Sequence, residues 1–179
     1  MVDDDIELRR LHISDAQQIS EWLNDKENIK YMSTVVRCKN HSKESIERNI
    51  KHSDPTYEQE FIIILKDSKK PVGYCGIDGL DLYDKTGEVF FLLGDKTQQG
   101  KGFGKKSVRL LLDFAFKEMG LNNILGTATV ENKSSIAVME RAGFKRIGIR
   151  REYNYIDGDF MDEVMLDMIY KDYKELYEK

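Results

Sequence analysis

The chain has 179 residues, of which 40% are hydrophobic and 34% are charged, and its formal net charge is −4. This composition is typical of one soluble globular domain, and it excludes a disordered or fibrous chain. The mildly acidic balance argues against a protein that coats nucleic acid, because such a protein needs a bulk positive charge.

The first residues and the two cysteines bear on cellular location. The sequence begins Met-Val-Asp-Asp-Asp, without a basic or apolar leader, and it contains no run of 18 apolar residues. We therefore expect a cytosolic protein that does not enter a membrane. Cys38 and Cys75 lie far apart and lack Cys/His spacing, so we expect ordinary thiols and no metal site.

The N-terminal third predicts one strand and two helices. The strand is expected at residues 6–8. Ser14 and Gln17 form a capping-box pattern that predicts a helix start, and the Asn24-Asp25 pair predicts its end. A second helix is expected to begin after Ser42 and to end before the Asp-Pro pair at residues 54–55.

The middle of the chain predicts a hairpin, a strand and a long helix. Residues 61–65 and 72–77 are β-rich runs separated by turn chemistry, and a further strand is expected at residues 88–93. Residues 102–119 show apolar positions at helical spacing, and Gly120 is the expected C′ residue.

The last third predicts a strand at residues 124–130, a short helix at 134–142, and two strands around the Asp157-Gly158 turn. A charged helix is expected from residue 171. The predicted order is therefore β-α-α-β-β-β-α-β-α-β-β, which indicates a single α/β domain over residues 1–179. Its central sheet should be mixed, mostly antiparallel and flanked by helices.

The most informative segment is the glycine-rich loop before the long helix. It reads Gln98-Gln99-Gly100-Lys101-Gly102-Phe103-Gly104-Lys105-Lys106. Glycines let the backbone approach a ligand, and the following helix N-terminus favours an anion, so the loop predicts a phosphate site. The spacing excludes a Walker A loop and a Rossmann fingerprint. A flexible helix-capping turn with solvated lysines is the alternative interpretation.

The loop resembles the Gln-x-x-Gly-x-Gly signature of the GNAT acetyltransferase superfamily. Three further segments, at residues 88–96, 130–144 and 155–162, resemble the RimJ/RimL-like branch of that superfamily. The resemblance implies acetyl-CoA as the acetyl donor, with no metal. It also implies that the strand before the loop and the following strand splay apart, with the pantetheine arm in the gap.

By this resemblance, cofactor binding involves a strand end, the loop and two later side chains. The residues are Leu92, Leu93, Gly94, Gln99, Gly100, Lys101, Gly102, Phe103, Gly104, Lys105, Asn132 and Arg141. Two of them have simpler interpretations as well. Asn132 could serve only as a helix cap, and Arg141 could be a surface charge.

Glu88 is the candidate general base. It begins the strand whose far end would hold the thioester, and it matches a position where the family often places a base that acts through water. The alternative is a solvated glutamate at a strand end. Many family members carry a tyrosine at position 139 as the acid that protonates the thiolate. This chain has Met139, which cannot donate a proton, so we assign no general acid.

The resemblance implies an amine acceptor, which could be a polyamine, an amino sugar or a protein α-amine. Nucleic acid and membrane are not expected as partners, and a homodimer is left open. Candidate acceptor contacts are Tyr31, Tyr153 and Tyr155, and acidic residues such as Asp25, Glu27 or Asp81 would favour a polycation. The rival hypothesis is a CoA-binding regulatory module with weak catalysis, which Met139 would support.

Overall fold

The computed structural model describes residues 1–178, and its centre is a seven-stranded sheet. The sheet order is β1-β2-β3-β4-β5-β7-β6, and every neighbouring pair is antiparallel except β4 and β5. The strands are β1 (Ile6–Arg10), β2 (Gln59–Leu65), β3 (Pro71–Asp81), β4 (Thr86–Leu92), β5 (Asn123–Thr129), β6 (Lys145–Ile156) and β7 (Asp159–Ile169). This is the mixed, mostly antiparallel sheet that the sequence predicts.

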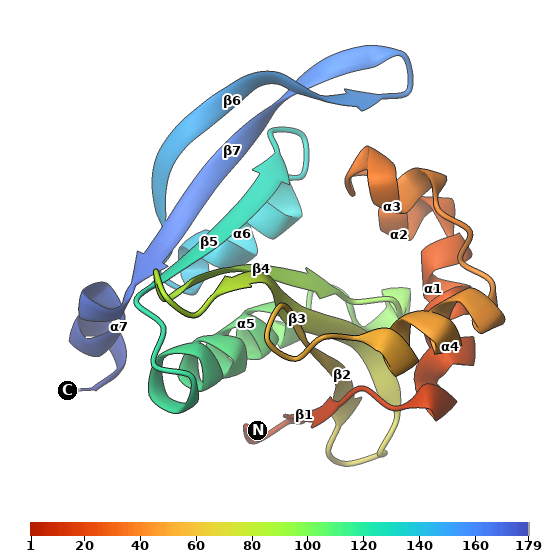
Figure 1. Ribbon diagram of the computed structural model, residues 1–179, viewed down its shortest axis with the longest axis horizontal. Helices are drawn as coiled ribbons and strands as arrows, with labels where there is room; N and C mark the ends of the chain where they lie inside the picture. The colour runs from red at the N-terminus through yellow and green to blue at the C-terminus, as the bar shows by residue number, and fades with distance from the viewer. Residues whose placement is uncertain (179) are drawn as a thin grey trace.

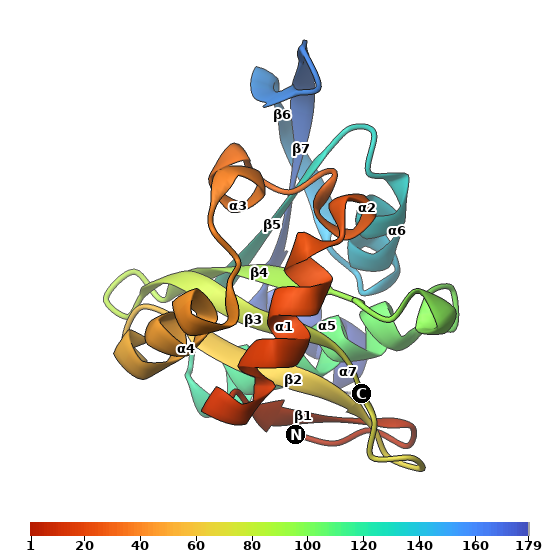
Figure 2. The ribbon, with the colours of Figure 1, turned by 90° about the vertical axis from the view of Figure 1, so that its right-hand side faces the viewer.

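Helices cover both faces of the sheet (Figures 1 and 2). They are α1 (Ala16–Asn24), α2 (Lys26–Ile29), α3 (Thr34–Cys38), α4 (Lys43–His52), α5 (Phe103–Asp113), α6 (Lys133–Arg141) and α7 (Tyr170–Tyr177). None of the helices within residues 1–178 is long and apolar enough to cross a membrane.

Alternation along the strands divides the buried side chains between two cores. Phe61 and Ile63 of β2 belong to the larger core with α5 and α6, whereas Ile62 and Ile64 pack against α1 and α4. Successive strand residues point to opposite faces, so one run of five apolar residues supplies both cores. Burying each such side chain contributes about 1.5–3 kcal/mol.

The sheet opens between β4 and β5. Their parallel pairing covers only Thr86, Gly87 and Glu88, which lie opposite residues 123–125, and beyond Glu88 the two strands diverge (Figure 1). This confirms the expected splay. From Val89 onward, the edge of β4 that faces β5 has no strand partner within the described residues.

Beyond the opening, β6 and β7 form a long hairpin that extends away from the rest of the sheet (Figure 2). Its turn is the predicted Asp157-Gly158 pair, and both residues have positive φ, 54° and 100°. Glycine at the second position of such a turn avoids a steric cost.

Local differences from the predictions have identifiable causes. His12, not Ser14, begins the first helical segment: its Nδ1 accepts from Ser14 N at 3.3 Å, and its own N–H donates to Asp15 at 2.8 Å. Helices α2 and α3 were not predicted, because segments of four and five residues are too short to show a period. The long helix ends in a π-helical turn at Phe114–Glu118.

Candidate active site

The glycine-rich loop begins α5 as predicted. Gly100 and Gly102 have φ of 77° and 88°, and Gly102 is the N-cap of α5. These left-handed positions favour glycine. At Gly104 a Cβ would lie 3.4 Å from Val138, so α5 and α6 approach closely behind the loop. The loop is thus a glycine-built turn in front of a helix N-terminus, which is an environment that favours a phosphate.

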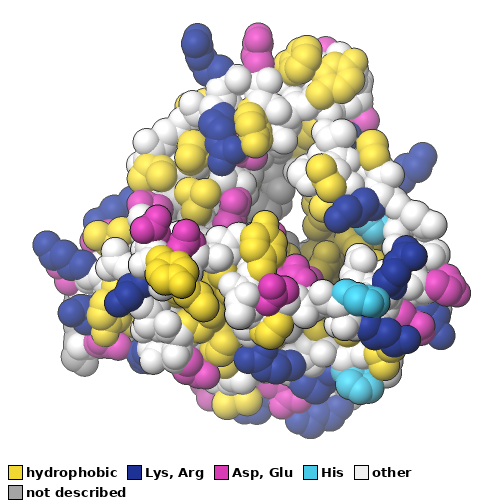
Figure 3. All heavy atoms as spheres, in the orientation of Figure 1, with side chains coloured by type: hydrophobic (Ala, Val, Ile, Leu, Met, Phe, Trp, Pro, Cys, Tyr) yellow, Lys and Arg dark blue, Asp and Glu magenta, His cyan; other side chains and the backbone are white. Residues whose placement is uncertain are grey.

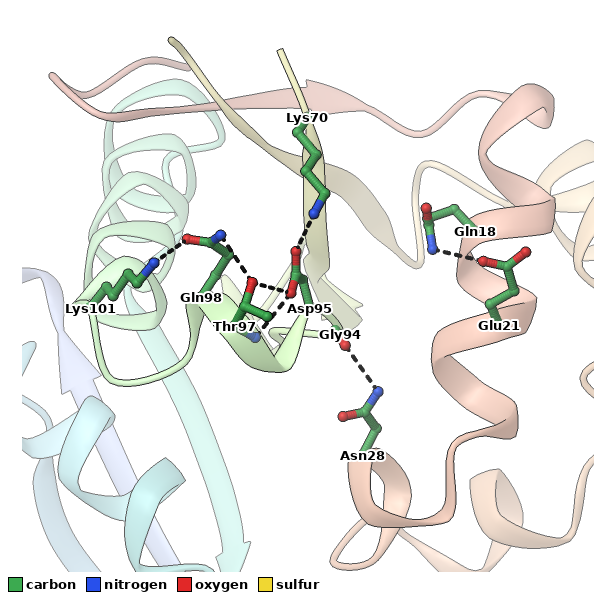
Figure 4. Close-up of polar contacts among 9 residues, drawn as sticks. All are labelled: Gln18, Glu21, Asn28, Lys70, Gly94, Asp95, Thr97, Gln98 and Lys101. Atoms are coloured by element: carbon green, nitrogen blue, oxygen red, sulfur yellow. Dashed lines mark hydrogen bonds and ion pairs between the residues drawn. The ribbon is translucent and has the colours of Figure 1, made fainter. Parts of the chain in front are cut away.

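A polar network holds the beginning of this loop in place (Figure 4). Asp95 accepts from Lys70 at 2.6 Å and from the backbone and hydroxyl of Thr97 at 3.0 and 2.6 Å. These contacts, with Lys70 first, hold the pKa of Asp95 at about 2. Lys101 donates to Gln98 at 3.0 Å. These contacts hold the first residues of the loop against β3 and against one another.

Side chains from two segments donate hydrogen bonds to the two residues that directly follow β4. The Leu93 carbonyl accepts from Gln99 Nε2 at 3.0 Å, and the Gly94 carbonyl accepts from Asn28 Nδ2 at 3.3 Å. A Cβ on Gly94 would lie 2.1 Å from Trp22, so only glycine allows this ring to pack here. Asn28 and Trp22 thus connect the α1–α2 segment directly to the strand end expected to hold the pantetheine arm.

Helix α6 carries Asn132 and Arg141, the two predicted cofactor side chains. Asn132 is the N-cap of α6, and its Oδ1 accepts from Ser135 N at 3.2 Å. Its contact with the cofactor stays a prediction. Arg141 is exposed and lies one turn beyond Val138, the residue that contacts the loop. Met139 is 1% exposed, and its sulfur packs over Gly126. Met139 is therefore a core residue.

Glu88 lies at the last paired position before β4 and β5 diverge. Its side chain is half-buried, and its Oε1 accepts a 2.6 Å hydrogen bond from the hydroxyl of Thr127 on β5. The Thr127 side chain therefore joins the two strands just after their backbone pairing has ended. A carboxylate at the vertex of the opening is well placed to take a proton from a group bound within it.

Further carboxylates share this face of the sheet with Glu88. Asp78 lies opposite Glu88 in the β3–β4 register, and Glu60 lies diagonally from Asp78 on β2. Burial, followed by the charges of Glu58 and Asp78, raises the pKa of Glu60 to about 7. Although Asp78 is accessible to solvent, the atoms packed around its carboxyl and the charges of Glu88 and Glu58 raise its pKa to about 6.

None of these four carboxylates forms an ion pair within residues 1–178. Burial is the main cause of both raised pKa values, and the neighbouring carboxylates raise them further. Opposite charge from a ligand would lower both pKa values. We name Glu58, Glu60, Asp78 and Glu88 the carboxylate row.

A fifth carboxylate, Glu163, lies on β7 opposite Thr129 of β5. It is only 7% exposed. Arg150 Nε lies 3.1 Å from its Oε2, and Asn154 donates to its Oε1 at 3.4 Å. Burial is the main cause that raises the pKa of Glu163, and the nearby Glu88 charge raises it further.

Sequence reasoning missed Glu60, Asp78 and Glu163, because they converge only through the strand register. The acidic residues named from the sequence have other partners. Asp25 pairs with Lys96 at 2.6 Å, and Asp81 accepts two backbone N–H groups in the β3–β4 turn. Glu27 is exposed on α2.

The candidate tyrosines are spread around the opening. Tyr31 is half-buried beyond α2, and Tyr153 lies beneath the Arg150 guanidinium at 4.4 Å. Tyr155 is 52% exposed and packs on Phe160 at 5.0 Å, on the opposite face from its buried neighbour Asn154. The structure therefore does not bring Tyr155 to the face that carries Glu88.

The space-filling view shows a hollow beside these groups. In the orientation of Figure 1, the surface is hollowed between β5 and helices α2 and α3, and acidic side chains are visible below the hollow (Figure 3). The phosphate-type loop and the carboxylate row flank the same splayed strand, β4, near its two ends. One site therefore combines a place for an anion with a place for a cation.

Comparisons with known proteins agree with this arrangement. Residues 5–145 match the model of the acetyltransferase (GNAT) domain family. The chain is 28% identical over 167 residues to the uncharacterized N-acetyltransferase p20 of Bacillus licheniformis, with 93% of each chain covered. It is 30% identical over 102 residues to the putative ribosomal N-acetyltransferase YdaF of Bacillus subtilis, covering 57% of this chain and 55% of YdaF.

Among solved structures, the spermidine N-acetyltransferase of Vibrio cholerae in complex with CoA and spermine superposes with a TM-score of 0.85. The two chains are 22% identical, and the match covers 96% of this chain and 99% of the other. At that identity the comparison establishes a shared fold.

Proposed function

The chain belongs to the acetyltransferase (GNAT) domain family and is an acetyl-CoA-dependent N-acetyltransferase, and we propose that its acceptor is a polyamine or a similar polycationic amine. The observation that carries the acceptor proposal is the carboxylate row, which the strand register brings together and whose members form no ion pair in the described part of the chain. Adjacent strands lie about 4.8 Å apart and diagonal neighbours about 7–8 Å apart. That spacing suits ammonium groups separated by a few methylenes. The Vibrio cholerae spermidine N-acetyltransferase, which has the same fold, is in complex with CoA and spermine, and this supports a polycationic acceptor.

The reaction needs a neutral amine. For an amine with a pKa near 10.4, deprotonation at pH 7 costs roughly 4–5 kcal/mol, so a base at the site is useful. We assign this role to Glu88, which lies at the vertex of the opening. The amine nitrogen then attacks the thioester carbon directly, the carbon–sulfur bond breaks, and CoA leaves as the thiol. Backbone N–H groups along the open edge of β4 would stabilise the oxyanion.

Cofactor binding is assigned to the loop and the end of β4. Gly100, Gly102 and the N-terminus of α5 would hold the pyrophosphate, with Lys101 and Lys105 as nearby charges. We also propose that residues 1–179 form one acetyltransferase domain of the RimJ/RimL-like branch. The single continuous sheet and the closing hairpin support this placement.

The acceptor proposal is tested by neutralising the carboxylate row away from Glu88. The double variant Glu60→Gln/Asp78→Asn should raise the KM for spermidine about tenfold and leave the KM for a simple monoamine unchanged. The exposed turn variant Asp84→Asn is the matched control for lost negative charge. Equal effects on both amines would contradict the proposed polycation site.

A further inference from the structure

Phe90 is an aromatic residue that belongs to neither hydrophobic core of the described residues. It lies on β4, two residues after Glu88, and its side chain is half-buried. Val89 and Phe91 pack in the larger core, so strand alternation places Phe90 on the face that carries Glu88. Part of the Phe90 ring is therefore available to a ligand on the acceptor side of the sheet.

The Phe90 ring lies across a gap in the side chains of β3. Gly76 is directly opposite Phe90 in the β3–β4 register and directly opposite Glu60 in the β2–β3 register. A Cβ on Gly76 would lie 2.7 Å from two carbons of the Phe90 ring, so glycine is needed here for the ring to fit. The ring thus extends from β4 over β3, toward the strand that carries Glu60.

Carboxylates and a tyrosine border this ring. Asp78 and Glu88 form the next pair on the same face of β3 and β4. On the other side, Tyr74 meets the ring edge-on, with centroids 5.5 Å apart and planes at 61°. Acidic and hydrophobic side chains adjoin one another below the hollow in Figure 3. The carboxylate row therefore has an apolar ring between its members on β2 and those on β3 and β4.

A linear polyamine has the same alternation of charge and apolar surface, because methylene spacers separate its ammonium groups. Carboxylates attract the ammonium groups, but they gain nothing from the methylenes. An aromatic ring removes methylenes from water, and each buried methylene is worth about fourfold in affinity. The face of the ring also attracts a nearby cation.

We propose that Phe90 is a specificity-determining residue of the acceptor site, against which the methylene spacer of a linear polyamine packs while the carboxylate row binds the ammonium groups on either side. This inference deepens the proposed polycation acceptor and rests on it. Phe90 selects amines with apolar spacers over amines of equal charge whose spacers contain oxygen, because a polar atom on the ring would lose its water.

The test compares two diamines of equal charge and similar length. They are 1,5-diaminopentane and its analogue in which an ether oxygen replaces the central methylene. Calorimetry on the CoA-loaded protein at pH 7 measures both dissociation constants without turnover. The wild-type protein should bind the all-methylene diamine at least about fourfold more tightly. In Phe90→Ala this preference should disappear, whereas Glu60→Gln/Asp78→Asn should weaken both diamines alike and keep the wild-type ratio.

Phe160→Ala is the matched control. Phe160 is 65% exposed and lies opposite Tyr155 in the β6–β7 register, on the face away from Glu88. Affinity for CoA should be unchanged in every variant. Phe90→Leu, which offers a smaller apolar surface beside Gly76, should give an intermediate ratio, and it provides the measurement if Phe90→Ala binds no CoA.

Equal binding of the two diamines by the wild-type protein would overturn the inference. A wild-type ratio in Phe90→Ala, or in Phe90→Leu where that variant provides the measurement, would overturn it as well. A wild-type protein that acetylates no polyamine would instead refute the proposed function.

Discussion

Glu88 is the residue on which the proposed chemistry depends most. Glu88→Gln keeps the hydrogen bond from Thr127 but removes the base, so kcat/KM for an amine of pKa near 10.4 should fall about 100-fold at pH 7. Thiol release from acetyl-CoA measures this, and calorimetry should show unchanged CoA affinity. Glu7→Gln, in the half-buried first strand, is the control. Wild-type turnover by Glu88→Gln would exclude Glu88 as the base.

Glu60 should make stability depend on pH. Its folded-state pKa is raised to about 7 from an ordinary value of 4.5, so the folded state binds the proton more tightly. The contribution of Glu60 to the free energy of unfolding is therefore fully present below about pH 4.5, and it is lost as pH rises toward 7. Glu60→Gln should be more stable than the wild type at pH 8, by about 1–2 kcal/mol, and similar at pH 4.5.

Urea denaturation at the two pH values measures this effect, and the exposed Glu118→Gln substitution controls for the loss of one charge. A Glu60→Gln variant that is less stable at pH 8 would show that ionised Glu60 makes favourable contacts.

The sequence identified Glu88 because that position belongs to a recognisable strand. It did not identify Glu60, because nothing in a short apolar run tells which residue of a distant strand lies beside it.

The loop between β4 and α5 was predictable as an element because glycine spacing is a local property. Gly102→Ala should weaken CoA binding several-fold, since a φ of 88° is strained for alanine and the strain alters the N–H groups that begin α5. Calorimetric titration with CoA measures this. Gly148→Ala is the matched control, because its added Cβ would meet nothing within 4 Å. Equal affinities would contradict the role assigned to the loop.

The contact between α1 and the end of β4 was not predictable from sequence. Nothing in the sequence pairs Trp22 with Gly94, whereas the structure packs the Trp22 ring on this glycine. Gly94→Ala should destabilise the fold by about 1–3 kcal/mol, because the new Cβ would lie 2.1 Å from the ring. Chemical denaturation measures the loss. Restoration by a second change, Trp22→Leu, would confirm the clash, and an unaffected single variant would exclude it.

At the scale of the whole molecule, the proposed function depends on the opening of the sheet between β4 and β5. Periodicity and turn chemistry predicted the strands and the larger helices, and the resemblance of short motifs implied that the strand before the loop splays from the next strand. The convergence of carboxylates from β2, β3, β4 and β7 depends on register and twist, which a single sequence does not encode locally. The fold was therefore more predictable than the acceptor side of the site.

The most direct test of the account is thiol release from acetyl-CoA by the wild-type protein across a matched set of amines. The set contains polyamines, monoamines, amino sugars, sugar nucleotides and peptides with free α-amines, each assayed at low and high salt. We expect saturable turnover with polyamines and a KM that rises with salt, since screening weakens their attraction to the carboxylate row. Preferential turnover of an α-amine peptide or a sugar nucleotide, or a polyamine KM that does not respond to salt, would contradict it.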